Sequence, residues 1–425
     1  MARFVGVKHN RICVVSDNSF HNQDLTLIEV PDNLSHLSAS ELLIDCKIKD
    51  QQIYYKGLKK PASQLKVAFV GNWKMRCGIA TFSENLWPEI IKHISDFKLF
   101  IEKTDLLTGD IYQLGDQILS DQQVVMCWER GKSLSPLVKE IKEYDPDIVF
   151  IQHEFGLWPN AAYWLAMLSQ LSEYRVICTM HSVFHHKDKT IVEAAIPEIV
   201  VHLDGAKKLL EEKGVISKIT VIPHGCYSFT EERLWNFYHS NYTFMQQGFG
   251  FEYKNFEASI QAAAILKNKY PNVFFTALIS ESPYNMVGHT TYYNKLMSLV
   301  SQYSLEENVS LIRGFQSDQV IDSYLRTNQV AVFPYISIPG HEVFGASGAA
   351  RLAMSKNTPI ITSSIPHFSD VPSIKADTPE EIAAALEKLF TDPVAKQQQL
   401  QNQIQYIQDN TWEKIGLRYK DLFEN

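Results

Sequence analysis

The chain lacks the cysteine and hydrophobic patterns that mark zinc-binding, secreted and membrane-spanning proteins. Its six cysteines form no CxxC pair, so they indicate neither a zinc module nor a disulfide framework, and a reducing cytosol fits this usage best. No apolar run approaches the ~20 residues that span a bilayer. The opening residues, MARFVGVKHNRICVV, also lack the apolar run of a signal peptide. We therefore expect a cytoplasmic protein.

An excess of basic charge and the familiar nucleotide-binding loops are missing as well. The 425 residues carry a formal net charge of -8, which argues against nucleic acid as the main partner. The P-loop pattern GxxxxGK[ST] is absent. The nearest match to a dinucleotide fingerprint, GFGFEY at 248–253, has no third glycine, so we set aside a nicotinamide enzyme. A local basic patch that meets an anionic lipid or a nucleotide phosphate stays open.

What the sequence does contain is a repeated alternation of short apolar strands with helical patterns. Hydrophobic residues make up 45% and charged residues 21%, as in ordinary folded proteins. The apolar runs KVAFVG, DPDIVFIQHE, YRVICTMHS and KITVIPHG alternate with helical segments, and a second series runs from NYTFMQQGFG to PIITS. This alternation predicts βαβ units with parallel sheets. We expect an α/β protein with two Rossmann-like, doubly wound domains that face a cleft.

The predicted domain boundaries follow from where these two series begin and end. Residues 1–62 alternate short apolar runs with polar turns, which predicts a small β-rich extension. We expect the first Rossmann-like domain at 63–235 and the second at 236–409, with 225–241 as the link between the two series. In such sheets, ligands bind at the carboxyl ends of the strands.

One stretch, PGHEVFGASGAARLAMSKNTPII at 339–361, places a carboxylate directly before a run of very small residues. Glu342 precedes Gly345, Ala346, Ser347 and Gly348. Small residues let a ligand approach the backbone, and a helix that starts here would aim its free N–H groups at that ligand. The alternative is a tight contact between helix and sheet in which the small residues only pack.

A second glycine-containing loop, GNWKMRCGIATFSENL at 71–86, joins a predicted strand to a predicted helix. Gly71 ends the strand and Gly78 opens the helix. A helix N-terminus carries about half a unit of positive charge and suits a phosphate or a sugar hydroxyl. The alternative is an ordinary turn that needs glycine for its geometry.

Several polar residues follow the strands of the first series. His181 comes just after YRVICTM, and His185 lies four residues later, but the preceding strand argues against helical spacing and no third metal ligand is near in sequence. We therefore predict no metal site and a hydrogen-bonding role for His181. His153 and Glu154 stand where another strand meets a loop, either as ligand contacts or as structural groups.

The ordered set of motifs resembles a known family. GNWKMRCGIATFSENL, IQHEFG, TMHS, VHLDGAKKLLEEKG, VIPHG, GFGFEYKNFEASIQAA, HEVFGASGAARLAMSKNTPIITSS and TWEKIGLRYKDLFEN occur in the order seen in the retaining glycosyltransferases of family GT4, which have the GT-B fold and belong to the group 1 glycosyl transferases. The resemblance covers residues 66–425. It also implies that the last helix, 410–425, crosses back to the first domain.

The resemblance implies an activity. A retaining hexosyltransferase of this family moves a sugar from a UDP- or GDP-linked donor to a glycan, a lipid-linked or another hydroxyl acceptor, as in polysaccharide biosynthesis. It keeps the anomeric configuration, and it needs no cofactor and no metal ion for the chemistry.

By position, the resemblance also implies site residues. Glu342 matches the first Glu of the family's E-x7-E motif, which contacts the hydroxyls of the donor sugar, and His181 matches the His beside the transferred sugar. These two residues are the implied catalytic pair. The implied donor-binding residues are Gly78, Lys254, Phe344, Gly345, Ala346 and Ser347.

The chain departs from the family pattern in two places. The second Glu of the motif falls at Ala350, and Phe251 stands where the family has a phosphate-binding Arg. Ser347 is a candidate to replace one hydroxyl contact, and Arg313 or Arg351 to replace the missing cation. The departures support an alternative, a catalytically weakened GT-B protein that binds nucleotide sugars or acts as a scaffold.

A lysine-rich segment raises the question of membrane contact. LDGAKKLLEEKGVISK holds four lysines on or near one helix: Lys207, Lys208, Lys213 and Lys218. Each lysine near an anionic surface contributes about 1 kcal/mol. Glu211 and Glu212 dilute this charge, which favours a solvated helix face. A weak peripheral contact at the inner membrane face remains the alternative to a purely cytoplasmic protein.

Overall fold

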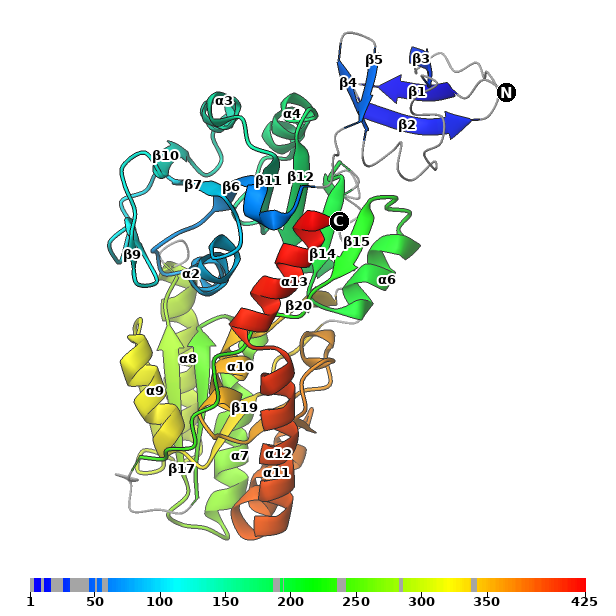
Figure 1. Ribbon diagram of the computed structural model, residues 1–425. Helices are drawn as coiled ribbons and strands as arrows, with labels where there is room; N and C mark the ends of the chain where they lie inside the picture. The colour runs from blue at the N-terminus through cyan, green and yellow to red at the C-terminus, as the bar shows by residue number, and fades with distance from the viewer. Residues whose placement is uncertain are drawn as a thin grey trace. The chain divides into compact units, whose positions relative to one another are not determined.

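The structure is a computed structural model. It describes residues 4–8, 11–16, 26–30, 46–49, 52–55, 60–185, 192–193, 195–234, 242–282, 286–337 and 342–425. By its internal contacts the chain divides into two compact units (Figure 1). The first unit comprises Met1–Val183, Lys187–Ile222 and Gly416–Asn425, and the second comprises Phe184–His186 and Pro223–Ile415.

The first unit is built on a seven-stranded sheet in which every described pair of neighbours is parallel. Buried parallel strands need an apolar side chain on both faces, and the run IVFIQH of β11 is buried at every position. The strand order is β10 (Val124–Trp128), β7 (Asp96–Glu102), β6 (Lys66–Gly71), β11 (Ile148–His153), β12 (Arg175–Met180), β14 (Glu198–Val201) and β15 (Lys218–Val221).

Helices cover both faces of this sheet. On one face, Trp87 of α2 (Gly78–Ile91) packs on Phe69, and Tyr419 of α13 (Trp412–Glu424) packs on Phe150. On the other face, α3 (Ser135–Tyr144) and α4 (Ala161–Gln170) pack side by side. The remaining described elements of this unit are α6 (Asp204–Glu212), the short strands β8 (Gln113–Leu114) and β9 (Gln117–Ile118), and the turn η2 (Ala62–Gln64). The short strand β13 (Ser182–Phe184) begins in this unit, and its last residue belongs to the second.

A partly buried ion pair at the edge of the first sheet holds the last helix of the chain. Arg175, at the start of β12, donates to both carboxylate oxygens of Glu198 at 2.6 and 2.9 Å. It also donates to the carbonyl oxygens of Leu422 and Phe423, in the last turn of α13. A cation at a helix C-terminus is favourable because the helix dipole is negative there.

The strands that precede this unit are antiparallel. A three-stranded sheet has the order β2 (Arg11–Ser16), β1 (Phe4–Lys8), β3 (Thr26–Glu29), and β4 (Cys46–Lys49) forms a hairpin with β5 (Gln52–Tyr55). The β-rich character predicted for 1–62 is confirmed in these strands. The other residues between 1 and 59, except Val30, lie outside the described residues.

The second unit is built on a six-stranded parallel sheet. Its order is β18 (Val309–Arg313), β17 (Phe274–Ser280), β16 (Thr243–Phe249), β19 (Val330–Phe333), β21 (Ile360–Thr362) and β22 (Ile374–Lys375). Adjacent residues of β16 serve different cores, since Phe244 joins one buried cluster and Met245 the other.

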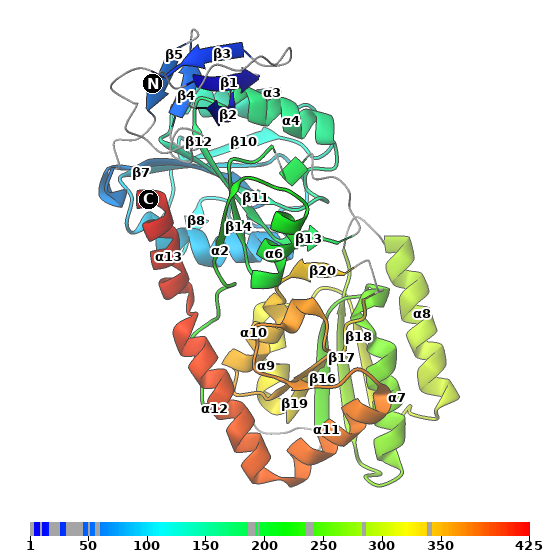
Figure 2. The same ribbon diagram turned by 90° about the vertical axis from the view of Figure 1, so that its right-hand side faces the viewer.

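Each of these clusters lies under its own layer of helices, on opposite sides of the sheet (Figure 2). One layer consists of α7 (Phe256–Lys267), α8 (Met286–Gln302) and α11 (Pro379–Thr391). The other consists of α9 (Asp318–Thr327), α10 (Gly348–Ser355) and α12 (Pro393–Asp409). Two parallel sheets, each with helices on both faces, confirm the predicted α/β class with two doubly wound domains.

The second unit begins and ends at the same place. The Cys226 N–H donates to the carbonyl oxygen of Asn410 at 2.8 Å, and the Trp412 N–H donates to that of Cys226 at 3.1 Å. The indole of Trp412 lies so close to Gly225 that a Cβ there would be 2.2 Å from the ring. Only glycine fits this contact, which holds the incoming and outgoing segments together.

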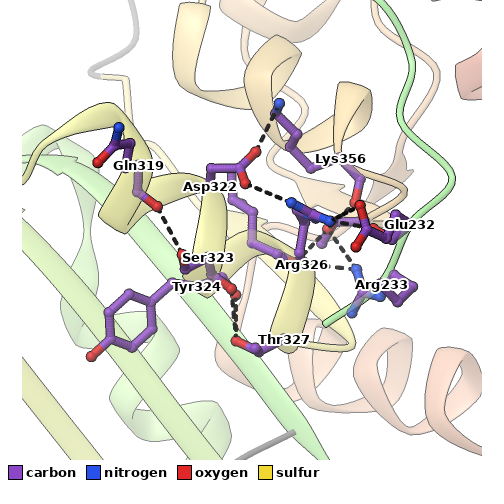
Figure 3. A network of polar contacts seen from close by, with 11 residues as sticks. Glu232, Arg233, Gln319, Asp322, Ser323, Tyr324, Arg326, Thr327 and Lys356 are labelled. Carbon is purple, nitrogen blue, oxygen red and sulfur yellow. Dashed lines mark hydrogen bonds and ion pairs between the residues drawn. The ribbon is translucent and has the colours of Figure 1, made fainter. Parts of the chain in front are cut away.

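A partly buried arginine anchors the incoming segment to two helix ends (Figure 3). The Arg233 guanidinium donates to the carbonyl oxygens of Leu325 and Asn357 at 3.1 Å each and to Thr358 Oγ1 at 2.9 Å, and it bonds the Asn328 carbonyl as well. Burial, and then the nearby charge of Arg326, lowers the pKa of Arg233 to about 10. The acceptors lie at the C-terminal ends of α9 and α10, where the helix dipoles favour a cation.

Ion pairs extend this anchor across the surface of α9. Asp322 pairs with Arg326 at 3.1 Å and with Lys356 at 2.7 Å, and Arg326 also pairs with Glu232 at 2.5 Å (Figure 3).

In the part of the chain that the structure describes, no helix combines the length and the apolar character that crossing a bilayer requires.

Candidate functional site

The carboxyl edge of the second sheet gathers a lysine, a tyrosine and a serine from three loops. Lys254 lies in η3 (Glu252–Lys254), just after β16, and its Nζ is 3.7 Å from the ring centroid of Tyr335, just after β19. The Tyr335 hydroxyl is 3.4 Å from Ser347 Oγ. A cation over an aromatic face is held electrostatically, which fixes Lys254 beside the start of α10.

The start of α10 presents backbone N–H groups at this edge. Ser347 is the N-cap, and its hydroxyl accepts a hydrogen bond from the Ala350 N–H at 3.3 Å. Gly348, the first helical residue, is exposed, and the first turn holds no acidic side chain. A helix start leaves N–H groups without intrahelical partners and carries partial positive charge, so an anion or a hydroxyl group is favoured here.

Glu342 leads into this helix through the short strand β20 (Val343–Gly345). Its carboxylate is partly exposed, with Oε2 3.7 Å from His185 Nδ1, and its carbonyl oxygen accepts a hydrogen bond from the His185 N–H at 2.9 Å. Phe344 and Ala346 are partly exposed and Gly345 is buried. The described part of the predicted stretch thus runs from carboxylate to helix start without a break, whereas 338–341 lie outside the described residues.

Two residues of this edge escaped sequence reasoning. His367, in η4 (Pro366–Phe368), is held neutral because burial, and then the charge of Lys254, lowers its pKa to about 4. Tyr335 carries the cation–π contact with Lys254. The available signals were weak: Tyr335 ends the apolar run VAVFPY, and His367 lies four residues after the apolar run PIITS.

The two arginines suggested as replacement phosphate ligands are already engaged. Arg351 is only 1% exposed, forms an ion pair with Asp370 and donates to Tyr406 Oη at 3.0 Å. Arg313, at the end of β18, donates to Glu281 Oε1 at 2.6 Å and lies partly exposed. The second position of the motif holds Ala350, which has no carboxylate and is fully buried.

In the first unit, the predicted loop residue Gly78 is the first residue of α2. Nothing lies within 4 Å of a Cβ placed at Gly78, so the helix start is open. The loop before it includes Lys74 in the left-handed region at φ 48°, and Lys74 Nζ pairs with Glu84 at 3.2 Å. A non-glycine residue in this conformation is uncommon.

His181 stands at the end of β12 within a cluster of rings. Its Nε2 is 2.8 Å from Gln152 Oε1, and its ring meets the edge of Phe82 with centroids 4.7 Å apart. Burial, then His202 and then His153, holds the pKa of His181 well below 6.5. The imidazole is therefore neutral at pH 7, and it remains partly exposed.

The sequence left the roles of His153 and Glu154 open, and in the structure both make contacts with neighbouring residues of the first unit. His153 is fully buried, with Phe155 and Trp164 edge-on to its ring. The Glu154 carboxylate accepts a hydrogen bond from the Phe155 N–H at 3.0 Å, and its carbonyl oxygen accepts from the Trp158 N–H at 3.2 Å. Glu154 thus builds the turn that follows β11.

An open pocket of about 380 Å³ lies elsewhere on the second unit, over α9 and α10. Its lining residues are Tyr227, Asp318, Gln319, Asp322, Ser323, Leu352 and Lys356, none of which the sequence had singled out. Among the described residues, no group of three or more His, Cys, Asp or Glu side chains is placed to hold a metal ion. Metal independence remains a prediction.

A comparison of the sequence with known protein families matches a segment of the second unit. Residues 231–408 match the family Glycosyl transferases group 1. This segment contains Lys254, Tyr335, Glu342 and the start of α10. A comparison with curated proteins finds no match.

Solved structures share the fold of the chain. Sucrose-phosphate synthase from Thermosynechococcus elongatus is 17% identical, covering 85% of this chain and 98% of that chain at a TM-score of 0.61. The α,α-trehalose-phosphate synthase from Burkholderia xenovorans, in complex with glucose-6-phosphate, is 11% identical, with coverages of 85% and 100% and a TM-score of 0.67. Anabaena Alr3699/HepE, in complex with UDP and glucose, is 12% identical, with coverages of 85% and 100% and a TM-score of 0.62. The chain has their two-domain GT-B fold.

Proposed function

We propose that the protein is a retaining glycosyltransferase that uses a nucleoside-diphosphate sugar. One observation carries the proposal: Lys254 lies beside the start of α10 at the carboxyl edge of the second sheet, and Glu342 leads into that helix, inside the segment that matches the group 1 family. A cation and a row of helix N–H groups suit a diphosphate, and a neighbouring carboxylate suits sugar hydroxyls. The solved structure with UDP and glucose supports this type of ligand.

In this proposal each residue has a distinct task. Lys254 and the N–H groups at the start of α10 bind the diphosphate, and Ser347 keeps that helix start in place through its cap. Glu342 accepts hydrogen bonds from hydroxyls of the transferred sugar. In the first unit, the open start of α2 at Gly78 offers further N–H groups, and His181 contacts the sugar.

The proposed chemistry is a substitution on one face of the sugar ring. The bond between the anomeric carbon and the diphosphate oxygen breaks, and a bond to the acceptor oxygen forms on the same side, so the configuration is retained. The proton of the acceptor hydroxyl passes to the departing diphosphate. Lys254 and the helix N–H groups stabilise the negative charge that develops on the leaving group, which is the main contribution of the protein.

The finer assignments rest on family resemblance. We propose UDP or GDP as the nucleotide, a glycan, a lipid-linked or another hydroxyl compound as the acceptor, and no cofactor or metal ion for the chemistry. Membrane contact through α6 has less support, because Lys207 pairs with Glu211 at 3.9 Å and Lys208 with Glu212 at 3.8 Å along the helix. We propose a cytoplasmic protein on the grounds of its cysteine usage.

A second candidate is a GT-B protein that binds nucleotide sugars without turnover. The observation that favours it is the buried Ala350 in place of the second Glu, together with the pairing of Arg351 to Asp370 and of Arg313 to Glu281. These features remove the side chains that the family uses at the ribose and at the phosphates. Binding without catalysis would be the consequence.

The test is a panel of UDP-, GDP-, ADP- and dTDP-sugars followed by thermal stability and by NMR of slow donor hydrolysis. A ligand at 100 times its dissociation constant stabilises the fold by about 2.7 kcal/mol, which is easily measured. Wild type is compared with Glu342→Gln and with a matched control, Glu306→Gln. Glu306 is exposed and precedes β18, so it lies at the opposite, amino-terminal edge of the sheet.

Three results separate the candidates. Stabilisation by one donor class, with hydrolysis lost in Glu342→Gln and kept in Glu306→Gln, supports the transferase. Stabilisation without hydrolysis, and without transfer in a screen of hydroxyl acceptors, favours the binding protein. No stabilisation by any nucleotide sugar refutes both.

A further inference from the structure

A buried glutamine lies behind the histidine of the first unit. Gln152 occupies the penultimate position of β11 and is 0% exposed. Its side chain packs against Gly71 at the end of β6, where a Cβ would stand only 3.1 Å from it. The glutamine therefore sits directly beneath the carboxyl edge of the first sheet, next to the loop that leads to α2.

The hydrogen bond from His181 to Gln152 fixes which ring nitrogen carries the proton. Gln152 Oε1 can only accept, and it lies 2.8 Å from His181 Nε2, so Nε2 must carry the hydrogen. A neutral imidazole has one N–H, which leaves Nδ1 with a lone pair. Among the described residues Nδ1 has no hydrogen-bond partner, and it does not belong to the buried unpartnered atoms.

The second polar atom of the amide argues for a function. Gln152 Nε2 is buried and has no partner among the described residues. Reversing the amide would leave Oε1 as the buried unpaired atom and would place an N–H against His181 Nε2, so the tautomer follows the amide orientation that the structure shows. A buried polar atom without a partner destabilises a fold, so keeping an amide here calls for a reason beyond packing.

We propose that Gln152 is a positioning residue that holds His181 in its Nε2–H tautomer, so that Nδ1 accepts a hydrogen bond from a hydroxyl of the bound sugar. This inference rests on the proposed function. The other groups that act on the His181 ring are His202, whose Nδ1 donates to the Ile222 carbonyl at 3.0 Å, and His153; Phe82 of α2 is apolar. None of them bonds Nε2, so the tautomer depends on Gln152.

The direct test is the tautomer itself, read from the ¹⁵N chemical shifts of histidine ring nitrogens in the full chain. The chain has 14 histidines, and His181→Asn assigns the signals of His181. We expect Nε2 protonated and Nδ1 unprotonated in the wild type. Gln152→Met should abolish this fixed state, and Gln152→Glu, which keeps an acceptor oxygen, should preserve it at high pH.

The matched control is Gln403→Met, which removes another fully buried amide. Gln403 lies on α12 in the second unit, where it accepts a hydrogen bond from the Ile360 N–H at 2.9 Å and donates to the Thr358 carbonyl at 3.0 Å. This variant loses stability by a purely structural route. It should leave the His181 signals unchanged.

Binding and pH dependence supply readouts that a packing role would not affect. Each sugar nucleotide of the panel is added in turn, and the one that binds should shift the His181 Nδ1 signal. Gln152→Met should lower kcat/KM for hydrolysis of that donor about tenfold, the effect of one hydrogen bond. Gln152→Glu should move the acid limb of the pH profile upward by a unit or more, since a carboxylate at Nε2 favours the imidazolium, which cannot accept at Nδ1.

Different failures have different meanings. An Nδ1–H tautomer in the wild type, or an unchanged tautomer in Gln152→Met, would overturn the inference. A donor that binds and is hydrolysed normally in Gln152→Met would overturn the role in the reaction. A fixed Nε2–H tautomer in a protein that binds no nucleotide sugar would instead refute the proposed function and, with it, the sugar contact.

Discussion

Replacing Lys254 with methionine should separate ligand binding from folding. In the free protein the charge of Lys254 has no carboxylate within ion-pair distance among the described residues, and burial lowers its pKa. The contact with the Tyr335 ring stabilises the cation by about 0.5–2 kcal/mol, and the burial of the charge opposes this. The two effects largely cancel, so Lys254→Met should change the free energy of unfolding by less than about 1 kcal/mol.

Donor binding should respond strongly to the same change. A hydrogen bond from a charged group contributes about 1.5–3 kcal/mol, so losing the one to the diphosphate should raise the dissociation constant about 10- to 150-fold. Calorimetric titration with the donor found in the panel measures the affinity, and urea unfolding measures the stability. Lys254→Arg, which keeps the charge, should recover part of the affinity.

Lys396→Met is the matched control for this variant. Burial lowers the pKa of Lys396 to about 8, and its Nζ bonds Gln329, which precedes β19 at the opposite edge of the sheet. Its loss should leave donor affinity unaltered. A dissociation constant within threefold of wild type for Lys254→Met would refute the placement of the diphosphate beside Lys254.

Three further predictions concern stability. Arg233→Lys should destabilise the second unit by about 3 kcal/mol in urea unfolding, because an ammonium cannot serve the diverging acceptors at the ends of α9 and α10. Arg175→Met should cost about 3 kcal/mol in the same assay, since among the described residues Glu198 would keep Lys218, at 3.4 Å, as its one ion-pair partner. For His367 the pKa of about 4 lies below the unfolded value of 6.5, so the unfolded chain binds more protons between these pH values. Stability should therefore fall as pH drops from 6.5 to 4, by at most about 3 kcal/mol, and urea midpoints at pH 7 and pH 4 should differ less in His367→Asn.

The fold could be predicted from the sequence because its main signals are local. Buried parallel strands are continuous apolar runs, as in β11 and β12. The helices between them can be recognised from the helical spacing of their apolar residues and from N-cap residues such as Asn160 and Ser347. The carboxyl edge of each sheet follows from strand direction alone. His181, which directly follows β12, could therefore be placed at this edge in advance, whereas Lys254 was named only through the family resemblance.

What the sequence could not supply was the set of partners for each side chain. From the sequence, Arg351 was a candidate to bind a phosphate, because it lies in a helix of small residues. Its partners in the structure are Asp370, 19 residues away and just after η4, and Tyr406, 55 residues away on α12. His153 and His181 follow similar strands, but one faces α4 in the core and the other remains partly exposed. Such differences arise from long-range packing, which no local pattern records.

The close contact between Gly225 and Trp412 bears on whether the second unit could be produced as a separate protein. Apart from Phe184–His186, the second unit is the continuous segment 223–415, and its two ends are adjacent hydrogen-bonded segments. This segment therefore has the topology of an insert carried by the first unit. We expect that 223–415 can be produced with its ends joined by a short linker, because hydrogen bonds already hold those ends together. The segment that matches the family, 231–408, lies wholly inside these ends, so the region with the family signature is also the region that we expect can be produced alone.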